Sequence, residues 1–302
     1  MSMDLDNFSK NIKGKIKFDY SLKNHTWLNI GGNAEIFFVP ETLVELREFL
    51  IYLKKKNNNL FIIGAGSNLL ISEDIKNYTF IKLGKNFNKI SVNKDNIVIA
   101  GCSLLDKFVS DFACNNNLSG LEFLSCIPGS VGGGIKMNSG CFGSEFKDVL
   151  LSVQVMDLDG RVFTIKSKDI RFGYRESNLP KNLIFLSASF LTKRKDRNEI
   201  EENIRRLKEK KENSQPLRVK TGGSTFKNPI NQSEKKVWEL IKESVDNQAS
   251  FGDARISDKH NNFFINSKNA SFENMLNLIN FVKNRVKEKT GVSLELELEI
   301  VK

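Results

Sequence analysis

The spacing of apolar and polar residues predicts alternating helices and strands along the chain. Apolar residues at helical spacing indicate a helix that begins after Thr42 and ends at Leu53, and Ser103 with Asp106 gives a capping signal for a helix to about Asn115. The alternating segment SLELELEIV predicts a strand at the C-terminus. The other predicted strands are 60–63, 79–83, 89–92, 97–100, a hairpin of 151–158 with 161–166 about an Asp-Gly turn, 183–192 and 263–266, and the other predicted helices are 198–213, 233–244 and 271–289.

A glycine-rich stretch at 121–143, LEFLSCIPGSVGGGIKMNSGCFG, interrupts this pattern. It contains too much glycine for an ordinary helix or strand. Because glycine permits positive φ and close approach to the backbone, such a segment is typical of a backbone cradle for phosphate. A tight structural crossover with nothing bound is an equally good interpretation. A second glycine turn begins at Gly64, directly after a predicted strand, which is where free backbone N–H groups meet a phosphate.

Neither of the two common nucleotide-binding motifs is present. The dinucleotide fingerprint would need glycine where Leu69 stands. The P-loop would need Lys followed by Ser or Thr after its last glycine, but Gly134 is followed by Ile135. The sequence therefore predicts phosphate-loop chemistry outside these two nucleotide folds.

Composition narrows the class of protein. A chain of 302 residues has room for two or three domains, and 40% hydrophobic with 27% charged residues is usual for a soluble globular protein. The N-terminus lacks the apolar core of a signal peptide, so we expect a cytoplasmic protein. Four cysteines without a CxxC pair predict reduced thiols and no metal site. The net charge of +10 fits an anionic small molecule, a nucleic acid or a general lysine bias, because the lysines are spread along the chain.

Six collinear segments identify a family. They are IGAGSNLLISE, GLEFLSCIPGSVGGGIKMNSGCFG, FGYRES, GGSTFKNP, DARISDKHNNFFIN and LELE. Over residues 24–297 the chain resembles UDP-N-acetylenolpyruvoylglucosamine reductases of the shorter, second type. The resemblance implies an enzyme of peptidoglycan precursor synthesis. Such an enzyme uses NADPH and non-covalent FAD to reduce the enolpyruvyl group of UDP-N-acetylglucosamine enolpyruvate to UDP-N-acetylmuramate.

The fold that the resemblance implies is α+β, with a vanillyl-alcohol-oxidase-type FAD-binding fold. Two α+β subdomains clasp the flavin, and a separate α+β domain binds the substrate. We expect the first subdomain at 1–76, joined by the terminal strand 293–302, and the second at 77–197. The substrate-binding domain, with its linking helix, is expected at 198–292.

Three residues match the catalytic positions of the family. Arg175 in FGYR would clamp the substrate carboxylate, Ser224 in GGSTF would donate a proton, and Glu297 in LELE would assist as an acid. Glu299 takes the place of Glu297 if the register slips by two. Outside the motifs, the same residues would be interpreted as a surface arginine, a turn serine and a solvent-facing glutamate.

The resemblance assigns binding residues as well. His260 is open between a functional and a structural role, and Asn29 stands where the family usually has arginine. The expected partners are the UDP-linked amino sugar and NADPH, with no nucleic acid, membrane or obligate protein partner. The alternatives are another FAD oxidoreductase of this fold and a basic nucleic-acid-binding protein. The implied FAD-binding residues are Gly64, Gly66, Ser67, Asn68, Pro128, Gly129, Ser130, Gly132, Gly133 and Asn138, and the implied substrate-binding residues are Lys227, Asn228 and Lys259.

Overall fold

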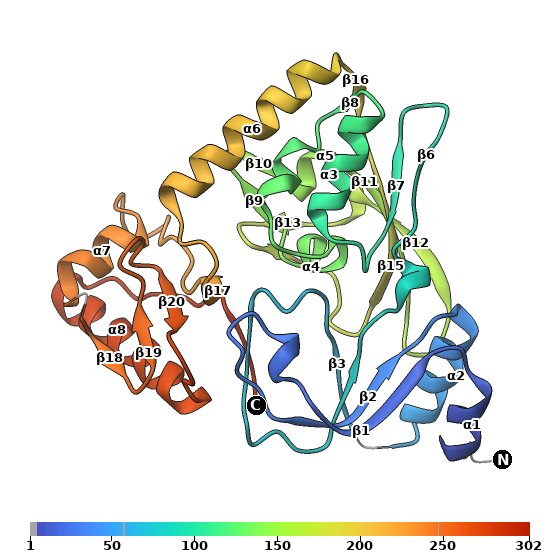
Figure 1. Cartoon of the computed structure of the whole chain (residues 1–302), viewed down its shortest axis with the longest axis horizontal. Coiled ribbons are helices and arrows are strands. Elements are labelled where there is room, and N and C mark those ends of the chain that lie inside the picture. The colour runs from blue at the N-terminus through green and yellow to red at the C-terminus, as the bar shows by residue number, and fades with distance from the viewer. Residues whose placement is uncertain (1–4, 57, 247) are drawn as a thin grey trace. The chain divides into compact units, whose positions relative to one another are not determined.

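The computed structural model describes residues 5–56, 58–246 and 248–302, and residues 1–4 of the expected first subdomain lie outside this part (Figure 1). The chain forms two compact units, each assembled from separate stretches of sequence. The expected division at 1–76, 77–197 and 198–292 stays a prediction. The first unit comprises Met1–Tyr20, Glu35–Ala65 and Asn77–Glu209, and the second comprises Ser21–Ala34, Gly66–Lys76 and Lys210–Lys302.

The first unit contains a four-stranded sheet of order β1-β2-β5-β3 beside helix α2. Thr42 caps α2 as predicted, since its side chain accepts a hydrogen bond from the Glu45 backbone N–H at 3.1 Å. Phe38 and Phe49 are fully buried between sheet and helix, with their ring centroids 4.2 Å apart. The elements are α1 (Leu5–Asn11), β1 (Lys15–Ser21), β2 (Asn33–Val39), α2 (Leu43–Leu53), β3 (Asn59–Ile62) and β5 (Tyr78–Ile81).

A five-stranded antiparallel sheet of order β12-β11-β15-β7-β6 forms the second layer of this unit. The predicted hairpin is confirmed, with Val153 opposite Ile165. The glycine-rich stretch and helix α3 share a buried apolar cluster with this sheet, which fixes the stretch to a rigid support. The elements are β6 (Ile90–Val92), β7 (Val98–Gly101), α3 (Asp106–Asn115), α4 (Val131–Lys136), α5 (Phe146–Val149), β11 (Leu150–Met156), β12 (Val162–Lys166) and β15 (Ile184–Phe190).

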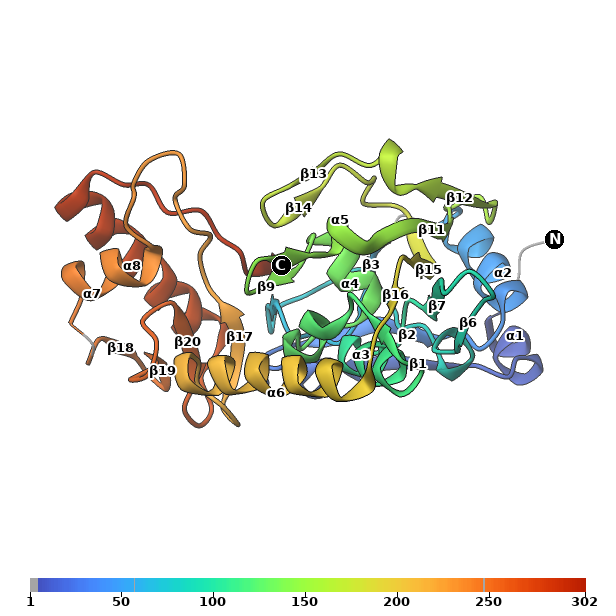
Figure 2. The same ribbon diagram turned by 90° about the horizontal axis from the view of Figure 1, so that it is seen from above.

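Short strand pairs complete the first unit. They are β8 (Leu118–Ser119) with β16 (Lys193–Arg194), β9 (Gly140–Cys141) with β10 (Ser144–Glu145), and β13 (Phe172–Gly173) with β14 (Glu176–Ser177). The predicted charged helix is confirmed as α6 (Arg197–Ser214), one continuous helix that contains the boundary between the units (Figure 2).

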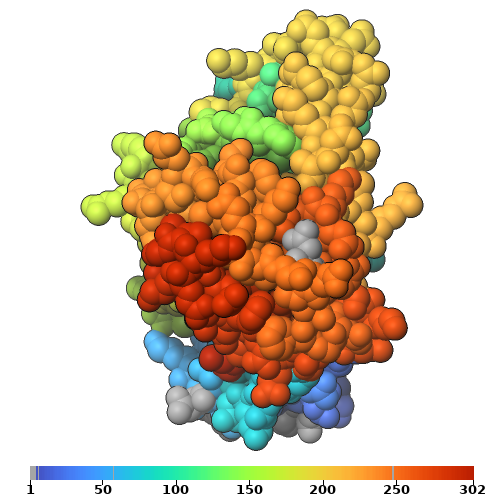
Figure 3. Space-filling view, turned by 90° about the vertical axis from the view of Figure 1, so that its left-hand side faces the viewer, coloured from blue at the N-terminus to red at the C-terminus, as the bar shows by residue number. Residues whose placement is uncertain are grey.

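The second unit is built on a four-stranded antiparallel sheet of order β17-β20-β19-β18, with helices α7 and α8 in the same apolar core. Ser271 caps the start of α8, and Gly291 ends it with a left-handed φ of 75°. Residues of the C-terminal third, orange to red in Figure 3, form much of this unit's surface in that view. The elements are β4 (Leu69–Ile71), β17 (Lys220–Ser224), α7 (Val237–Ser244), β18 (Ser250–Phe251), β19 (Ala254–Ile256), β20 (Phe263–Asn266), α8 (Phe272–Thr290) and β21 (Glu299–Val301).

Two predictions from the sequence are wrong. Leu105, not Ser103, is the N-cap of α3, because the Ser103 hydroxyl donates instead to the Gly84 carbonyl oxygen at 3.4 Å. The C-terminal strand is restricted to Glu299–Val301, which pairs with β4, while Leu296 before it makes only an isolated bridge to Phe226.

The glycine-rich stretch also contains a helix that its composition did not predict. Helix α4 includes three consecutive glycines, and close packing requires the last of them, Gly134. A Cβ on Gly134 would lie 2.2 Å from the Phe146 ring, so a side chain there would exclude the ring.

Asp106, the first residue of α3, is completely buried. Within the described part of the chain, neither of its carboxyl oxygens has a hydrogen-bond partner. Burial raises the pKa of this carboxyl well above its usual range, so the side chain is neutral in the folded protein.

This burial predicts a pH-dependent stability cost. An unfolded aspartate ionises near a pKa of about 3.9, whereas folded Asp106 keeps its proton to higher pH, so the folded state binds more protons. The free energy of unfolding therefore falls as pH rises through this window, by up to about 1.4 kcal/mol per pH unit. Asp106→Asn should unfold at a higher temperature than the wild type at pH 8, and calorimetry should show the gap narrowing toward pH 4.5. An unchanged gap at both pH values would contradict this explanation.

Candidate active site

The turn that contains Gly129 and Ser130 is fixed to the segment between β7 and α3 by backbone hydrogen bonds. Asp106 N–H donates to the Gly129 carbonyl at 3.1 Å, Val131 N–H to that of Leu104 at 2.9 Å, and Gly132 N–H to that of Cys102 at 3.0 Å. These hydrogen bonds pair some of the turn's backbone groups with the 102–106 segment. The N–H groups of Gly129, Ser130 and Gly133 donate to no acceptor in the described part of the chain.

The first glycine turn meets this second one at Gly64. A Cβ added to Gly64 would lie 2.4 Å from the Ser130 hydroxyl oxygen, and one added to Gly129 would lie 2.7 Å from an Asp106 carboxyl oxygen. The glycines therefore allow close backbone approach, and Gly64 of the first turn lies beside Ser130, one of the residues whose N–H the second turn leaves unused. This is the donor set that a diphosphate group needs, so these residues fit an FAD pyrophosphate.

The rest of the first turn belongs to the second unit and is fixed there. Gly66 has a φ of 70°, and a Cβ on it would lie 1.8 Å from the His25 carbonyl oxygen. The Asn68 side-chain amide donates to the Glu297 carbonyl at 2.8 Å, and the Glu299 N–H donates to the Asn68 carbonyl at 3.0 Å. Asn68 thus holds the segment that carries the predicted catalytic acid.

Asn138 is fully buried and its side chain binds protein groups. The side-chain N–H₂ donates to a Glu145 carboxylate oxygen and to the Gly173 carbonyl, both at 3.0 Å, and its oxygen accepts from the Lys147 N–H at 3.0 Å. Its predicted role at the cofactor is therefore limited to its backbone. Among the other predicted cofactor residues, Gly132 is packed against Cys102. Pro128 and Gly133 are exposed, and Ser67 is partly buried.

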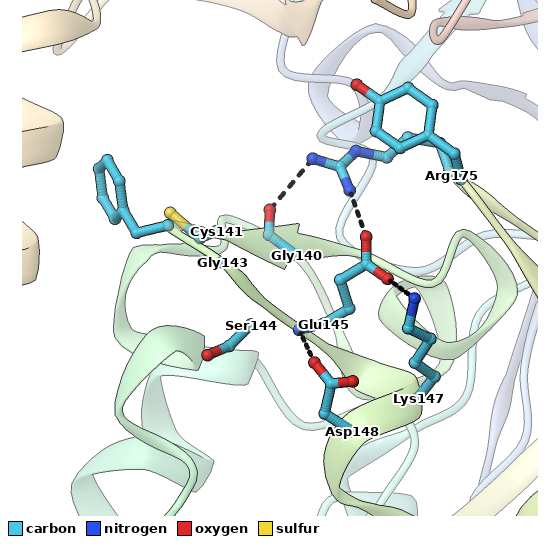
Figure 4. Close-up of a pocket in the computed structure, with 10 residues that line it drawn as sticks. Gly140, Cys141, Gly143, Ser144, Glu145, Lys147, Asp148 and Arg175 are labelled. Atoms are coloured by element: carbon cyan, nitrogen blue, oxygen red, sulfur yellow. Dashed lines mark hydrogen bonds and ion pairs between the residues drawn. The ribbon is translucent and has the colours of Figure 1, made fainter. Parts of the chain in front are cut away.

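Arg175 lies at a cavity of about 360 Å³ in the first unit (Figure 4). Its guanidinium donates to the Gly140 carbonyl at 3.2 Å, lies 3.8 Å from a Glu145 carboxylate oxygen, and stands 5.1 Å from the centroid of the Tyr174 ring. The guanidinium is thus presented to the cavity, as a carboxylate clamp requires. The cavity is lined by Gly140, Cys141, Phe142, Gly143, Ser144, Glu145, Lys147, Asp148, Tyr174 and Arg175.

Ser224 and Glu297 belong to neighbouring backbone segments of the second unit. Ser224 ends β17, and the Glu297 N–H donates to the carbonyl of the next residue, Thr225, at 2.9 Å. Glu297 is partly buried, whereas Glu295 and Glu299 are exposed. The fold therefore brings the predicted proton donor and acid into one region of the second unit, and Arg175 belongs to the first.

The predicted substrate residues also have structural partners. Lys227 N–H donates to the Glu295 carbonyl at 2.8 Å, and the Asn228 side-chain oxygen accepts from the Val237 N–H at 3.0 Å, at the start of α7. The Lys259 ammonium donates to the Glu212 carbonyl. The backbone of Lys227 and the side chains of Asn228 and Lys259 are thus engaged within the protein.

The side chains of His260 and Asn29 both make contacts within the protein. Burial lowers the pKa of His260, and its Nδ1 accepts the Asn262 N–H at 3.2 Å, which indicates a neutral ring with a structural partner. Asn29, which stands where the family usually has arginine, donates to the Lys23 carbonyl and the Asn24 side chain, both at 3.2 Å.

Comparison with known proteins gives consistent results. Residues 215–301 match the model of the UDP-N-acetylenolpyruvoylglucosamine reductase C-terminal domain, and residues 34–166 match that of an FAD binding domain. The UDP-N-acetylenolpyruvoylglucosamine reductase of Pelagibacter ubique is 52% identical over 99% of both chains. The chain belongs to this reductase family. The enzyme of the same name from Rickettsia prowazekii is 42% identical over 95% of this chain and 96% of its own.

A solved structure supports the same assignment. The UDP-N-acetylenolpyruvylglucosamine reductase of Thermus caldophilus has a TM-score of 0.81 and 31% identity, covering 96% of this chain and 100% of its own. The reductase family, the FAD-binding α+β fold and the FAD cofactor predicted from the sequence are thereby confirmed. The described residues include no helix that is long and apolar enough to cross a membrane.

Sequence reasoning missed Glu145 and Lys147, which line the cavity beside Arg175. Glu145 lies two residues after Gly143, the last glycine of the quoted motif, and this position was the only available signal. Its contact with Arg175, 30 residues farther along the chain, depends on folding.

The approach of Gly66 to His25 predicts that this glycine is required for flavin retention. Gly66→Ala would place a methyl group inside contact distance of the His25 carbonyl and should displace the turn. We expect the variant to purify with little bound FAD, measured by flavin absorbance per chain. Gly291→Ala is the matched control, because it has a similar φ of 75° with nothing within 4 Å of its Cβ. Full flavin content in Gly66→Ala would contradict the prediction.

Proposed function

We propose that this chain reduces UDP-N-acetylglucosamine enolpyruvate to UDP-N-acetylmuramate with NADPH. The supporting observation is the full-length similarity to named reductases, combined with Arg175, Ser224 and Glu297 at the catalytic motif positions. The expected location is the cytoplasm, where NADPH and the nucleotide sugar are available. The predicted three-part division into two flavin subdomains and a substrate domain belongs to this proposal.

FAD held at the two glycine turns would supply the redox chemistry that links oxidation of NADPH to hydride addition at the terminal carbon of the enolpyruvyl double bond. The neighbouring carbon then gains electron density that its carboxylate shares, and it must accept a proton. The reaction balances as one hydride and one proton added across the double bond, with NADPH oxidised to NADP⁺. The protein must therefore stabilise an anion and supply a proton.

Arg175 suits the first task. A guanidinium offers a planar pair of donors that matches a carboxylate, and its charge favours the developing anion. The cavity beside Arg175 would receive the enolpyruvyl carboxylate. Gly64, Ser130 and their neighbouring turn residues would hold the FAD pyrophosphate through backbone N–H groups.

Ser224 and Glu297 suit the second task. Ser224 would give its hydroxyl proton to the carbon, and Glu297 would assist as an acid. Glu297 is favoured over the exposed Glu299 because it is partly buried and its backbone N–H donates to the carbonyl of Thr225, the residue after Ser224. Lys227, Asn228 and Lys259 are proposed to contact the UDP moiety.

The proton-donor role of Ser224 predicts a split between the two half-reactions. Ser224→Ala should leave flavin reduction by NADPH unchanged and slow reoxidation by the UDP substrate about 10²- to 10⁴-fold, which is the usual loss for a positioned proton donor. Stopped-flow absorbance of the flavin measures both steps. Equal slowing of both would show that Ser224 acts on structure alone.

A further inference from the structure

Glu145 is surrounded by partners that fix its carboxylate beside Arg175. One carboxylate oxygen accepts from the Asn138 side chain at 3.0 Å and lies 2.7 Å from the Lys147 ammonium. The other oxygen lies 3.8 Å from the Arg175 guanidinium. The two oxygens therefore have different tasks, one anchored to the protein and the other turned to Arg175 (Figure 4).

The backbone around Glu145 is fixed as well. Glu145 is the N-cap of α5, with its N–H donating to the Asp148 carboxylate at 2.8 Å. Its Cγ would lie 2.7 Å from a Cβ on Gly140, so Gly140 cannot carry a side chain without displacing Glu145. The carbonyl of the same Gly140 accepts from Arg175. One hairpin thus supplies both the ion-pair partner and a carbonyl acceptor for the guanidinium.

Arg175 itself is held in a strained backbone conformation. Its φ is 58°, in the left-handed region that costs a residue with a side chain about 1–2 kcal/mol. The side chains of Arg175 and Glu145 are only 20% and 22% exposed. At 3.8 Å the two charges attract without forming a hydrogen bond, and low exposure strengthens that attraction.

We propose that Glu145 is a positioning residue for Arg175. The carboxylate oxygen beside Arg175 orients the guanidinium toward the cavity, and Lys147 and Asn138 hold that carboxylate in place. This inference rests on the proposed function, in which Arg175 receives the substrate carboxylate. Glu145 adds a negative charge near that carboxylate, so it serves orientation and opposes binding.

Loss of the Glu145 charge should have opposite effects on two measurements. It should slow the reaction, because Arg175 is no longer oriented, but it should not weaken substrate binding. Glu145→Gln keeps the size of the side chain and the contact with Asn138 but removes the charge that orients Arg175. The flavin-loaded variant should be reduced by NADPH within twofold of the wild-type rate. Reoxidation by UDP-N-acetylglucosamine enolpyruvate should slow at least about tenfold, because misplaced catalytic groups lose about that much or more. The Kd of this substrate for the oxidised protein, measured from the flavin spectrum, should stay equal or decrease.

The control is Glu176→Gln, which removes the same charge from an exposed side chain next to Arg175 but outside the cavity. We expect wild-type rates from it, since exposed charges are screened by water. Glu145→Asp keeps the charge and is a favourable N-cap, but it withdraws the carboxylate from Arg175. It should therefore slow reoxidation too. If Glu145→Gln folds poorly, the same experiment can be done with Glu145→Asp.

Three results would overturn the inference. These are wild-type reoxidation in both Glu145 variants, slowing of both half-reactions together, and a weakened Kd with no change in the reoxidation rate. A lower unfolding temperature accompanied by wild-type kinetics would likewise assign Glu145 to structure only. If wild-type protein itself is not reoxidised by this substrate, the proposed function fails, and that result is distinct from a failure confined to the variants.

Discussion

The close fit between the 129–132 turn and the 102–106 segment is the constraint on which the cofactor site depends. Three backbone hydrogen bonds join the two segments, and no side chain fits between Gly129 and Asp106. These bonds turn some amides of the loop inward and leave those of Gly129, Ser130 and Gly133 without an acceptor among the described residues. A cofactor phosphate would satisfy these groups, since unpaired polar groups at a partly buried site are costly. The neutral, buried Asp106 is part of the same packing.

The two units contribute different chemistry to the proposed reaction. The first unit presents a cation, Arg175, at a cavity where the Glu145 carboxylate and the Gly140 carbonyl lie beside its guanidinium. The second unit holds Ser224 and Glu297 on segments that backbone hydrogen bonds join. The Asn68 side chain also donates a hydrogen bond to the Glu297 carbonyl. Stabilisation of the anion and delivery of the proton are thus assigned to separate parts of the chain.

Local signals in the sequence predicted most of the fold. Thr42 caps its helix, and the Asp-Gly turn closes its hairpin, because neighbouring residues decide both features. The Ser103 cap was wrong since a distant carbonyl, that of Gly84, takes the hydroxyl. The glycine at position 134 in α4 is explained by the Phe146 ring that packs against it. Tertiary contacts override local preference at these positions.

The candidate site, like the fold, was predicted where a local motif decides it and missed where tertiary contacts decide it. Motif resemblance named Arg175, Ser224 and the glycine turns, but it gave no role to Glu145, whose partners come from different segments. Asn138 was named as a cofactor residue, although its side chain binds Glu145, Lys147 and Gly173. Contacts between segments distant in sequence determine these roles, and composition or spacing does not reveal them.

The central claim is that a flavin on this chain passes electrons from NADPH to the enolpyruvyl group of a UDP-linked sugar. The most direct measurement is anaerobic. The purified protein is reduced with one equivalent of NADPH, and UDP-N-acetylglucosamine enolpyruvate is then added while the flavin spectrum is recorded. The account predicts full recovery of the oxidised spectrum with one equivalent of substrate and formation of UDP-N-acetylmuramate. A flavin that stays reduced after excess substrate would contradict it.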